Sequence, residues 1–332
     1  MSRVWLITGA SRGLGRQWVI GALERGERVA ATARDLSALA DLRDSYGEAL
    51  EPIRLDVTDR QGCFAAVRAA HDRFGRLDVV VNNAGYGQYG FVEELSESEA
   101  RAQMDTNFFG ALWITQAVLP YLRAQASGHI VQVSSIGGVL AFPNLGIYHA
   151  SKWALEGMSQ ALAAEVEPFG IRVTLMEPGG FDTDWITAAP YAEPLAAYDA
   201  QRARFESARG ERRVDLGQPE ATRAAILAIV DATDPPRRVF LGRNTLEWAK
   251  AEYADNWRSG NAGGRWRLPR TARVRPRTPR SSGWCRAGRW RPDRRSRRPT
   301  TSTVRPAAAA PPTPVRRLVR RRTSYWPAWR PY

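Results

Sequence analysis

The sequence predicts an α/β protein built on one doubly wound parallel sheet with helices on both faces. Over the first 180 residues, short apolar runs alternate with amphipathic stretches, and this alternation is typical of parallel strands connected by helices. A glycine-rich segment follows the first apolar run and opens the first amphipathic stretch, which marks a tight strand-to-helix turn. Hydrophobic residues make up 44% of the 332 residues, enough to bury a large core.

Each expected strand is a short apolar run that ends at a polar or glycine-containing segment. In chain order these runs are Val4–Thr8, Arg28–Ala33, Pro52–Asp56, Asp78–Asn82, His129–Ser134, Arg172–Glu177 and Arg238–Leu241. The expected helices have apolar residues that recur every three or four positions. They are Leu14–Glu24, Arg60–Phe74, Glu99–Arg123 and Tyr148–Glu167.

Residues 181–215 interrupt this alternation. They contain Pro190, Pro194 and several aromatic residues, and they precede the last expected strand. Insertions at the carboxyl ends of strands commonly cover a substrate site. We therefore expect a substrate loop here, with an ordinary surface insertion as the alternative.

The distribution of charge divides the chain near residue 257. Residues 258–332 hold 22 arginines and one acidic residue, Asp293, whereas residues 1–257 hold 24 arginines, two lysines and 33 acidic residues. The formal net charge of +14 therefore resides in the tail. The acidic body gives no reason to expect a nucleic-acid partner, and we expect one catalytic domain over residues 1–257.

The tail, residues 258–332, has a composition unlike the body. Residues 259–332 contain no Lys, Ile, Phe, Glu, Gln, His or Met, which predicts a disordered segment. It is interpreted as a nucleic-acid-binding arm, as an anchor for anionic membranes, or as a frameshifted stretch of a G/C-rich gene. The frameshift is the favoured interpretation, because the missing residue types have mostly A/T-rich codons.

The cysteines and the N-terminus predict a cytoplasmic location. The chain has only Cys63 and Cys285, far apart in sequence, so a disulfide framework is not expected. The first strand begins within a few residues of Met1, leaving no room for a signal peptide. No apolar run approaches the roughly 18 residues of a membrane helix.

The glycine-rich segment predicts a dinucleotide site on a Rossmann-type sheet. It reads Thr8-Gly9-Ala10-Ser11-Arg12-Gly13-Leu14-Gly15. Glycines permit the tight turn and the close approach of backbone to a pyrophosphate, and the following helix offers free N–H groups to the anion. We expect Gly9, Ser11, Arg12, Gly13, Leu14 and Gly15 to bind this part of the cofactor.

The end of the second strand favours NADP(H) over NAD(H). Ala33 aligns with the acidic residue that would bind a ribose 2′-hydroxyl and select NAD, and Arg34 follows it. Arg12 and Arg34 together suit a 2′-phosphate, because guanidinium groups bind phosphate well. If Asp35 reached the ribose instead, NAD would be allowed.

Other expected cofactor contacts stand at the carboxyl ends of later strands, where ligands bind in such sheets. Asp56 is placed to accept a hydrogen bond from the adenine amino group. Small residues follow the fourth strand, where backbone passes near the cofactor, and a proline–glycine turn follows the sixth. The residues concerned are Asp56, Val57, Asn83, Ala84, Gly85, Pro178, Gly179 and Thr183.

Tyr148 and Lys152 form the candidate catalytic pair. A spacing of four places both side chains on one face of a helix, and a neighbouring ammonium favours phenolate, which predicts a lowered tyrosine pKa. Ser135 lies 13 residues before Tyr148, at the end of a strand. With ten tyrosines and two lysines, a chance pair at this spacing is expected roughly 6% of the time, so the motif needs its context.

That context resembles the short-chain dehydrogenase/reductase family. The motifs appear in the family's order over residues 3 to about 250: the glycine motif, Asn83-Ala84-Gly85, Asn107, Ser135, Tyr148-x-x-x-Lys152 and Pro178-Gly179. Segments Asn82–Gly87 and Glu177–Thr183 are most similar to the branch with 17β-hydroxysteroid dehydrogenase-like and retinol dehydrogenase-like members. Asp182 departs from the arginine common in related sequences, and the tail departs completely.

The resemblance implies an oxidoreductase that interconverts a carbonyl compound and its alcohol. Tyr148 is then the general acid/base, Lys152 lowers its pKa and holds the nicotinamide ribose, and Ser135 binds the carbonyl oxygen. Asn107 holds a water that connects Lys152 to solvent, or simply kinks its helix. Related enzymes imply a homo-oligomer, dimer or tetramer, through the helices Glu99–Arg123 and Tyr148–Glu167.

Aromatic residues predict a hydrophobic substrate. The expected pocket residues are Phe142, Phe181 and Trp185, with Tyr86, Gln88, Pro143 and Tyr191 as further candidates. No metal is expected, because His71, His129 and His149 lack ligand spacing. Two other functions remain open: a catalytically silent dinucleotide sensor on the same fold, and nucleic-acid binding through the tail.

Overall fold

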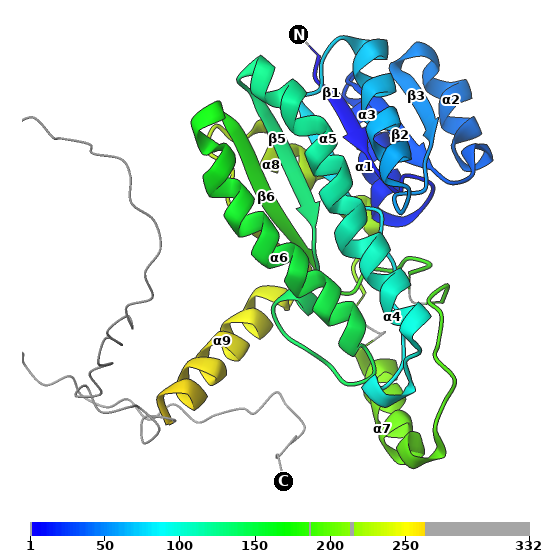
Figure 1. Ribbon diagram of the computed structural model, residues 1–332, viewed down its shortest axis with the longest axis vertical. Coiled ribbons are helices and arrows are strands. Elements are labelled where there is room, and N and C mark those ends of the chain that lie inside the picture. Colours follow the sequence, from blue (N-terminus) through cyan, green and yellow to red (C-terminus); the bar gives the residue numbers. More distant parts are fainter. Residues whose placement is uncertain (1, 186, 213–215, 263–332) are drawn as a thin grey trace, which may run out of the picture. The chain divides into compact units, whose positions relative to one another are not determined.

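The chain folds around one seven-stranded parallel sheet with the strand order β3-β2-β1-β4-β5-β6-β7 (Figure 1). The computed structural model describes residues 2–185, 187–212 and 216–262, all within one unit that spans Met1–Leu268. The strands are β1 (Val4–Ile7), β2 (Arg28–Ala33), β3 (Leu50–Arg54), β4 (Val79–Asn82), β5 (Gly128–Val133), β6 (Ile171–Pro178) and β7 (Arg238–Leu241). The predicted fold class is confirmed.

Helices fill all four predicted intervals, with one internal difference, and further helices form outside those intervals. They are α1 (Gly13–Glu24), α2 (Ala40–Tyr46), α3 (Arg60–Phe74), α4 (Glu97–Met104), α5 (Gly110–Gln125), α6 (Gly146–Val166), α7 (Asp199–Arg212), α8 (Thr222–Asp231) and α9 (Thr245–Ala262). The single helix expected over Glu99–Arg123 is divided by a π-helical turn at Asp105–Phe109. α7 lies inside the expected loop 181–215.

The predicted tail falls largely outside the described residues. Helix α9 continues past residue 257 as far as Ala262, so the change in composition does not coincide with the end of the helix. Residues 263–332 lie outside the described part of the chain, and the interpretations of the tail stay predictions.

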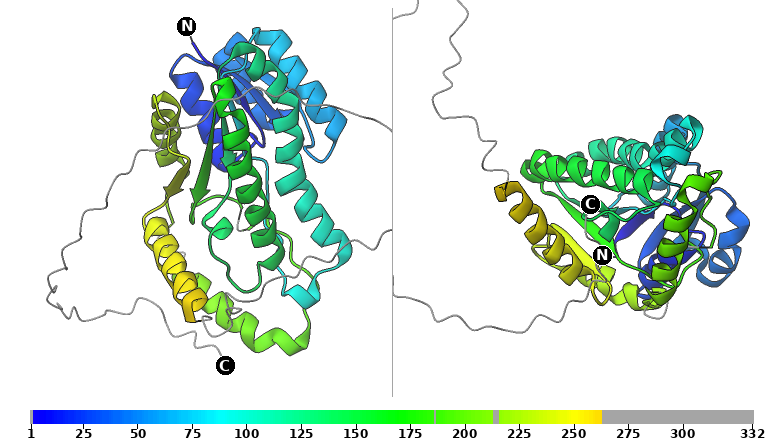
Figure 2. Two further views of the ribbon diagram at one scale, coloured as in Figure 1. Left: turned by 60° about the vertical axis from the view of Figure 1, so that its left-hand side comes forward. Right: turned by 90° about the horizontal axis from the view of Figure 1, so that it is seen from below.

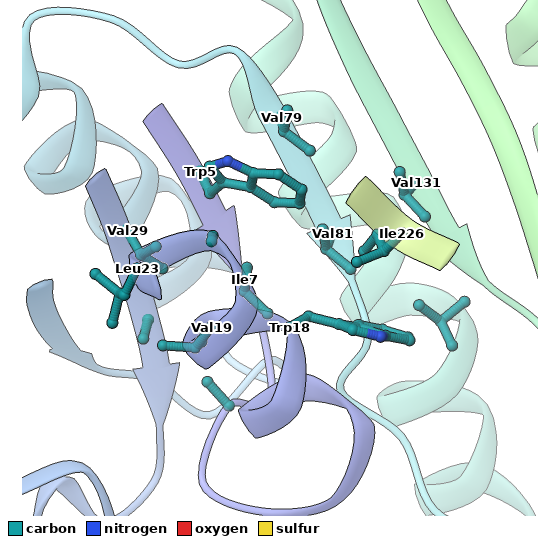
Figure 3. Close-up of a cluster of buried hydrophobic side chains, with 14 of the residues drawn as sticks. Trp5, Ile7, Trp18, Val19, Leu23, Val29, Val79, Val81, Val131 and Ile226 are labelled. Atoms are coloured by element: carbon teal, nitrogen blue, oxygen red, sulfur yellow. The ribbon is translucent and has the colours of Figure 1, made fainter. Parts of the chain in front are cut away.

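Side chains alternate between the two faces of the sheet, as the pleat of a strand requires. On β1, Trp5 and Ile7 enter a core cluster with residues of α1 and α8, which Figure 3 shows around Trp18 and Ile226. Val4 and Leu6 enter a second cluster with residues of α3, α5 and α6. The two clusters form the two helical layers, and the further views show helices on both sides of the sheet (Figure 2).

The strand order places the expected site at the carboxyl edge between β1 and β4. From β1 the chain adds β2 and β3 on one side and then returns to add β4 on the other. Such a reversal leaves a crevice at the strand ends, where ligands bind in open α/β sheets. Figure 1 shows α4 and α7 at the end toward which the strands point.

Two further features are the polarity of the helices and the surroundings of Cys63. Within the part of the chain that the structure describes, no helix has the length and apolar character needed to cross a bilayer. Cys63 is buried in the cluster beneath α3 and forms no disulfide. Burial, followed by the charges of Asp59 and Asp56, raises the pKa of its thiol to about 12.

Candidate active site

The glycine-rich loop between β1 and α1 is shaped by close approach of backbone. Gly9 and Gly13 have φ values of +64° and +56°, a region that other residues enter at a cost. A Cβ on Gly9 would lie 2.7 Å from the Ala84 Cα, and a Cβ on Gly15 would lie 2.3 Å from the Asn83 amide nitrogen Nδ2. These glycines are therefore required by the segment that follows β4 as well as by the turn itself.

Thr8 and Asn83 join the loop to the end of β4. The Asn83 Nδ2 donates to the carbonyl oxygens of Thr8 and Gly9, at 2.9 Å each. The Thr8 Oγ1 accepts from the backbone N–H groups of Asn83 and Ala84, at 3.0 and 3.1 Å. Thr8 was expected only as the first residue of the glycine motif, although a polar residue at the end of an apolar strand was a visible signal for this role.

The expected adenosine end of the site presents two arginines. Arg12 and Arg34 are exposed, and neither guanidinium has a hydrogen bond or ion pair to another described residue. Asp35 instead turns to its own chain: its Oδ1 accepts from the Ser37 N–H at 3.0 Å and caps the 3-10 turn Leu36–Leu39. Hydrogen bonds from Ser37 lower the pKa of the Asp35 carboxyl.

Other predicted cofactor residues also gather at this edge. The Asp56 Oδ1 accepts from Thr58 N–H and Oγ1, at 3.0 and 2.8 Å, so this carboxylate is held by its own loop. Val57 is buried against Gly110, where a Cβ would lie 2.7 Å from the valine Cγ2. Thr183 approaches the glycine loop, because its methyl group would lie 3.6 Å from a Cβ on Gly13.

The proline–glycine turn after β6 is held by the last strand. The Gly179 N–H donates to the Leu241 carbonyl at 2.8 Å. A Cβ on Gly179 would lie 2.4 Å from the Thr245 Cγ2, so α9 closes against the turn. The Pro178 carbonyl oxygen faces the Ser135 hydroxyl at 3.5 Å, which brings β6 to the end of β5.

Ser135, Tyr148 and Lys152 come together as the spacing predicted. Tyr148 and Lys152 lie in the first two turns of α6 and are 6% and 5% exposed. The Ser135 side chain lies near enough to the Tyr148 hydroxyl to lower its pKa, and the Ser135 Oγ accepts from the Gly137 N–H at 3.0 Å. The Lys152 Nζ donates to the Val133 carbonyl at 2.8 Å and lies 6.0 Å from the centroid of the Tyr148 ring.

The pKa of Tyr148 departs from the sequence-based expectation. Burial raises it well above its usual range, and this effect outweighs the Ser135 hydrogen bond that lowers it. Burial also lowers the pKa of Lys152 to about 8, against the opposing charge of Glu156. The structure therefore does not show the expected lowering of the Tyr148 pKa by Lys152. Burial disfavours the phenolate form of Tyr148 and the ammonium form of Lys152 alike.

Asn107 occupies the π-helical turn between α4 and α5. Its Oδ1 accepts from the Tyr86 N–H at 3.1 Å, and its Nδ2 donates to the Tyr86 carbonyl at 2.9 Å and to the Ser151 Oγ at 3.1 Å. A Cβ on Gly85 would lie 3.1 Å from this Oδ1 and 3.5 Å from the Lys152 Nζ. Asn107 thus joins the segment after β4 to α6, next to the lysine.

A buried acidic pair lies one helical turn beyond Lys152. Glu156 on α6 and Glu177 on β6 are 4% and 0% exposed, and Arg238 on β7 pairs with both, at 2.8 and 2.5 Å. Burial raises the pKa of each carboxyl. Sequence reasoning missed this group, although a glutamate ending an apolar strand was a visible signal.

The predicted substrate residues are only partly brought together. Trp185 packs edge-on against Tyr148, with ring centroids 5.1 Å apart, and lies 6.3 Å from Tyr89. Phe142 instead belongs to a cluster with Ala249 and Trp248 of α9. Phe181 is 8% exposed and packs in the core cluster of Figure 3 rather than in the cluster around Tyr148. Tyr89, not proposed from the sequence, takes the place expected of Phe181.

The segment that carries Trp185 is fastened to the segment after β4. The Ala192 N–H donates to the Tyr89 carbonyl at 2.8 Å, and the rings of Tyr89 and Tyr191 stack at 4.7 Å. The expected substrate loop thus covers Tyr148, whose ring belongs to the same small cluster as Tyr89, Leu145 and Ala189.

A buried ion pair holds the rest of this covering segment. Arg202 on α7 pairs with Glu94, whose side chain is fully buried. Glu94 also accepts from the Leu195 N–H at 2.9 Å, and Tyr198 stacks on Phe91 at 4.8 Å. We call the pair Glu94–Arg202 the latch.

No metal site accompanies this arrangement in the described ranges 2–185, 187–212 and 216–262, where no three His, Cys, Asp or Glu side chains gather. The arrangement has instead a glycine-rich loop at the carboxyl edge of the sheet. At the same edge lie Ser135, half-buried, and Tyr148 and Lys152, both buried, and the two hydroxyls of this group can donate and accept protons.

Comparison with known proteins agrees with these features. The family described as short chain dehydrogenase matches residues 3–193. The chain is 40% identical over 252 residues to oxidoreductase BOA17 of Botryotinia fuckeliana, covering 75% of this chain and 92% of that protein. It is 37% identical over 245 residues to a 3-ketodihydrosphingosine reductase of Bacteroides thetaiotaomicron, covering 72% and 88%.

Solved structures show the same likeness. A short-chain dehydrogenase from Streptomyces avermitilis has a TM-score of 0.75 and 37% identity, with 80% of this chain and 97% of that chain covered. A short-chain dehydrogenase from Burkholderia cenocepacia in complex with NADP has a TM-score of 0.63 and 28% identity, with 81% and 98% covered. One from Burkholderia phymatum in complex with NAD has a TM-score of 0.68 and 25% identity, with 78% and 95% covered.

The fold and the site therefore define an NAD(P)-dependent oxidoreductase on a Rossmann-type sheet. The chain belongs to the short-chain dehydrogenase family.

Proposed function

We propose that the protein is an NADP(H)-dependent oxidoreductase that interconverts a hydrophobic ketone or aldehyde and its alcohol, with Tyr148 as the general acid/base. The observation that carries the proposal is that Tyr148 and Lys152, one turn apart on α6, are both buried, and that the Ser135 side chain at the end of β5 acts on the Tyr148 hydroxyl. All three lie at the carboxyl edge of the sheet, where the glycine loop and Asn83 also meet.

The residues present fit a nicotinamide dinucleotide. Gly9 and Gly15 leave no room for a Cβ where the loop faces Ala84 and Asn83, so the loop presents backbone at the carboxyl edge of the sheet. Lys152 is buried yet makes a single hydrogen bond to a described residue, although an ammonium has three donors. Two of its N–H groups are left for the hydroxyls of a ribose, the role that the family resemblance implied.

The charges at the adenosine end support NADP(H). Arg12 and Arg34 have no partner among the described residues, and a 2′-phosphate would supply charge-assisted hydrogen bonds to both. Asp35 supports the same preference, because its Oδ1 is engaged with Ser37. In this proposal Asp35 stabilises its own turn and does not select NAD.

The chain's own residues provide the proton chemistry and the orientation. When bound, the cofactor supplies or accepts the hydride. Ser135 donates a hydrogen bond to the substrate oxygen, and preorganised donors of this kind are worth about 10²–10³ in rate. The Tyr148 hydroxyl, kept protonated by its raised pKa, gives its proton to the same oxygen during reduction and regains one in the opposite direction.

Lys152 and Asn107 complete the path for protons. The Lys152 ammonium stabilises negative charge on Tyr148 after proton transfer, because an opposite charge nearby favours the ionised form. Asn107 fixes the Tyr86 backbone beside the lysine, and we propose that its Oδ1 also orients the water that links Lys152 to solvent.

The covering segment supports a hydrophobic substrate. Trp185 and Tyr89 border Tyr148, and apolar walls favour an apolar ligand. The name of the Bacteroides relative, a 3-ketodihydrosphingosine reductase, supports a carbonyl compound as substrate. We take residues 1–257 as the catalytic domain, a homo-oligomer through α4–α5 and α6 as its assembly, and the cytoplasm as its location.

The test is turnover by a Tyr148→Phe variant against a panel of hydrophobic ketones and aldehydes, followed by NADPH and NADH absorbance. We expect the wild-type protein to oxidise NADPH with members of the panel and the variant to bind NADPH without turnover. Equal activity in the variant would refute the role of Tyr148. Faster turnover with NADH than with NADPH would refute the cofactor preference.

A further inference from the structure

His149, directly after Tyr148, is buried with both ring nitrogens engaged. It is 4% exposed. Its Nδ1 lies 2.9 Å from the Gly137 carbonyl oxygen, and its Nε2 accepts from the Phe142 N–H at 2.9 Å. The imidazole therefore bridges two backbone groups of the segment that connects Ser135 to α6.

These two partners require one protonation state of the ring. A backbone N–H can only donate, so the Nε2 that faces Phe142 must carry a lone pair. A backbone carbonyl can only accept, so the Nδ1 that faces Gly137 must carry the proton. The ring is thus neutral with its proton on Nδ1. Burial lowers the pKa of His149, and residues 136–145 contain no ionisable side chain.

Gly137 connects His149 to the serine of the site through its two neighbouring peptide groups. Its N–H donates to the Ser135 Oγ at 3.0 Å, while its carbonyl accepts from His149 at 2.9 Å. A Cβ on Gly137 would lie 2.7 Å from the His149 Nδ1 and 3.1 Å from the Tyr148 ring. The turn Ile136–Gly138 is therefore held directly against both rings.

We propose that His149 is a positioning residue for Ser135: its neutral imidazole holds the Gly137 carbonyl, and Gly137 in turn holds the Ser135 Oγ through its N–H, so that the serine hydroxyl is directed toward Tyr148 and the substrate oxygen. The role of Ser135 in this statement rests on the proposed function. His149 itself touches neither substrate nor cofactor. Through Phe142 it also fixes the far end of the same segment, so that one ring sets the distance between the turn and α6.

The protonation state can be tested without any substrate. Imidazole ¹⁵N spectra of the full-length protein contain signals from three histidines, and a His149→Gln variant identifies the one of interest. We expect a neutral ring with the proton on Nδ1 at pH 6, where free histidine with a pKa of about 6.5 is mostly charged. A charged ring, or a proton on Nε2, would overturn the proposal even if the protein turned over no ketone.

The link to Ser135 is tested with a double-mutant cycle. His149→Leu removes both hydrogen bonds, and we expect a loss of about tenfold in kcat with the NADPH dissociation constant unchanged, since the glycine loop is elsewhere. Because His149 acts through Ser135, His149→Leu should add little to the loss already caused by Ser135→Ala. Multiplied losses in the double variant would show a general structural role and sink the proposal.

His149→Gln is the conservative comparison, since its amide keeps one donor and one acceptor. We expect it to recover most of the kcat lost in His149→Leu, and to keep slow hydrogen exchange at the Gly137 and Phe142 amides. If His149→Leu does not fold, the glutamine variant and the ¹⁵N spectra still decide the matter. Failure of the proposed function would appear separately, as unaltered turnover in Tyr148→Phe.

Discussion

The cofactor side and the substrate side of the site are built in different ways. On the cofactor side, the tightest approach is between backbone atoms, because a Cβ on Gly9 would lie 2.7 Å from the Ala84 Cα. On the substrate side, the contacts nearest Tyr148 and within the latch join side chains, with Trp185 against Tyr148 and Arg202 paired with buried Glu94. At the backbone contacts of the cofactor side only glycine fits. The side-chain contacts of the substrate side could be made by several residue types. We therefore expect substitutions to alter the substrate side more readily than the cofactor loop.

The largest effect is expected from adding a methyl group to the glycine loop at Gly9. Gly9→Ala combines a positive φ, which costs roughly 1–2 kcal/mol, with the collision against Ala84. We expect cofactor affinity to fall about a hundredfold, a change of about 2.7 kcal/mol, as measured by titration with NADPH.

Gly26→Ala is the matched control. Gly26 has a φ of +76° but no atom within 4 Å of its added Cβ, so only the backbone strain is shared. It should lower the thermal midpoint and leave NADPH affinity unchanged. Equal loss of affinity in both variants would show that backbone strain, and not the close approach to Ala84, accounts for the effect of Gly9→Ala.

The latch tests the substrate side. Arg202→Met leaves the Glu94 carboxylate buried without its cation, which we expect to destabilise the covering segment by about 2 kcal/mol. Hydrogen exchange over residues 195–212 should accelerate and KM for the ketone should rise. The dissociation constant of NADPH should not move, and a shift in it would contradict the separation of the two sides.

Arg101→Met is the control for the latch. Arg101 pairs with Glu97, and their side chains are 73% and 78% exposed. Such a pair contributes less than about 1 kcal/mol, so this variant should change neither hydrogen exchange in the covering segment nor KM.

A smaller effect is expected from a substitution that tests the preference for NADPH over NADH. Arg34→Ala removes one guanidinium that we assign to the 2′-phosphate, and we expect NADPH to bind about tenfold less tightly, or about 1.4 kcal/mol. NADH, which lacks that phosphate, should bind as before. A parallel loss for both cofactors, measured by fluorescence titration, would assign Arg34 to the shared part of the dinucleotide.

The smallest expected effect concerns stability and pH at the acidic pair. The pKa of Glu177 is raised in the folded protein, so between an ordinary glutamate pKa of about 4.3 and this raised value the folded state holds a proton that the unfolded state has released. Stability from this source is therefore greatest at acidic pH and declines as the pH rises through the raised pKa.

Glu177→Gln should remove that decline, because its amide stays neutral and can still accept from Arg238. We expect its thermal midpoint to lie about 2 °C above that of the wild type at pH 8 and to match it at pH 5. Glu97→Gln, at an exposed position, should behave as the wild type at both values. If the thermal midpoint rose between pH 5 and pH 8 in the wild type but not in Glu177→Gln, the predicted direction of the pH dependence would be wrong.

The same contrast explains what could be predicted from the sequence. The cofactor loop could be predicted because its local backbone geometry requires glycine, and the required glycines stand close together in one motif. The Ser135, Tyr148 and Lys152 group was readable from spacing along one strand and one helix. The latch was not, since its partners are 108 residues apart and neither lies in a motif.

The direction of the Tyr148 pKa was also beyond the sequence. The Tyr–Lys spacing shows that a cation is near, but burial by Tyr89 and Trp185 depends on segments that meet only in the folded chain. The same limit applies to Phe181: its aromatic character predicted a substrate contact, whereas the ring completes the core beneath the sheet. Residue type alone does not tell which side of a loop faces the site.

The π-helical turn at Asp105–Phe109 has a consequence for how this helix could change. A π turn accommodates one more residue than a regular α-helix, and each residue rotates a helix by about 100°. Deleting one residue here would leave α4 in place and turn either Asn107 or the whole buried face of α5 away from its partners. We therefore expect the loss of one residue within the π-helical turn to disturb the fold more than a substitution beside it.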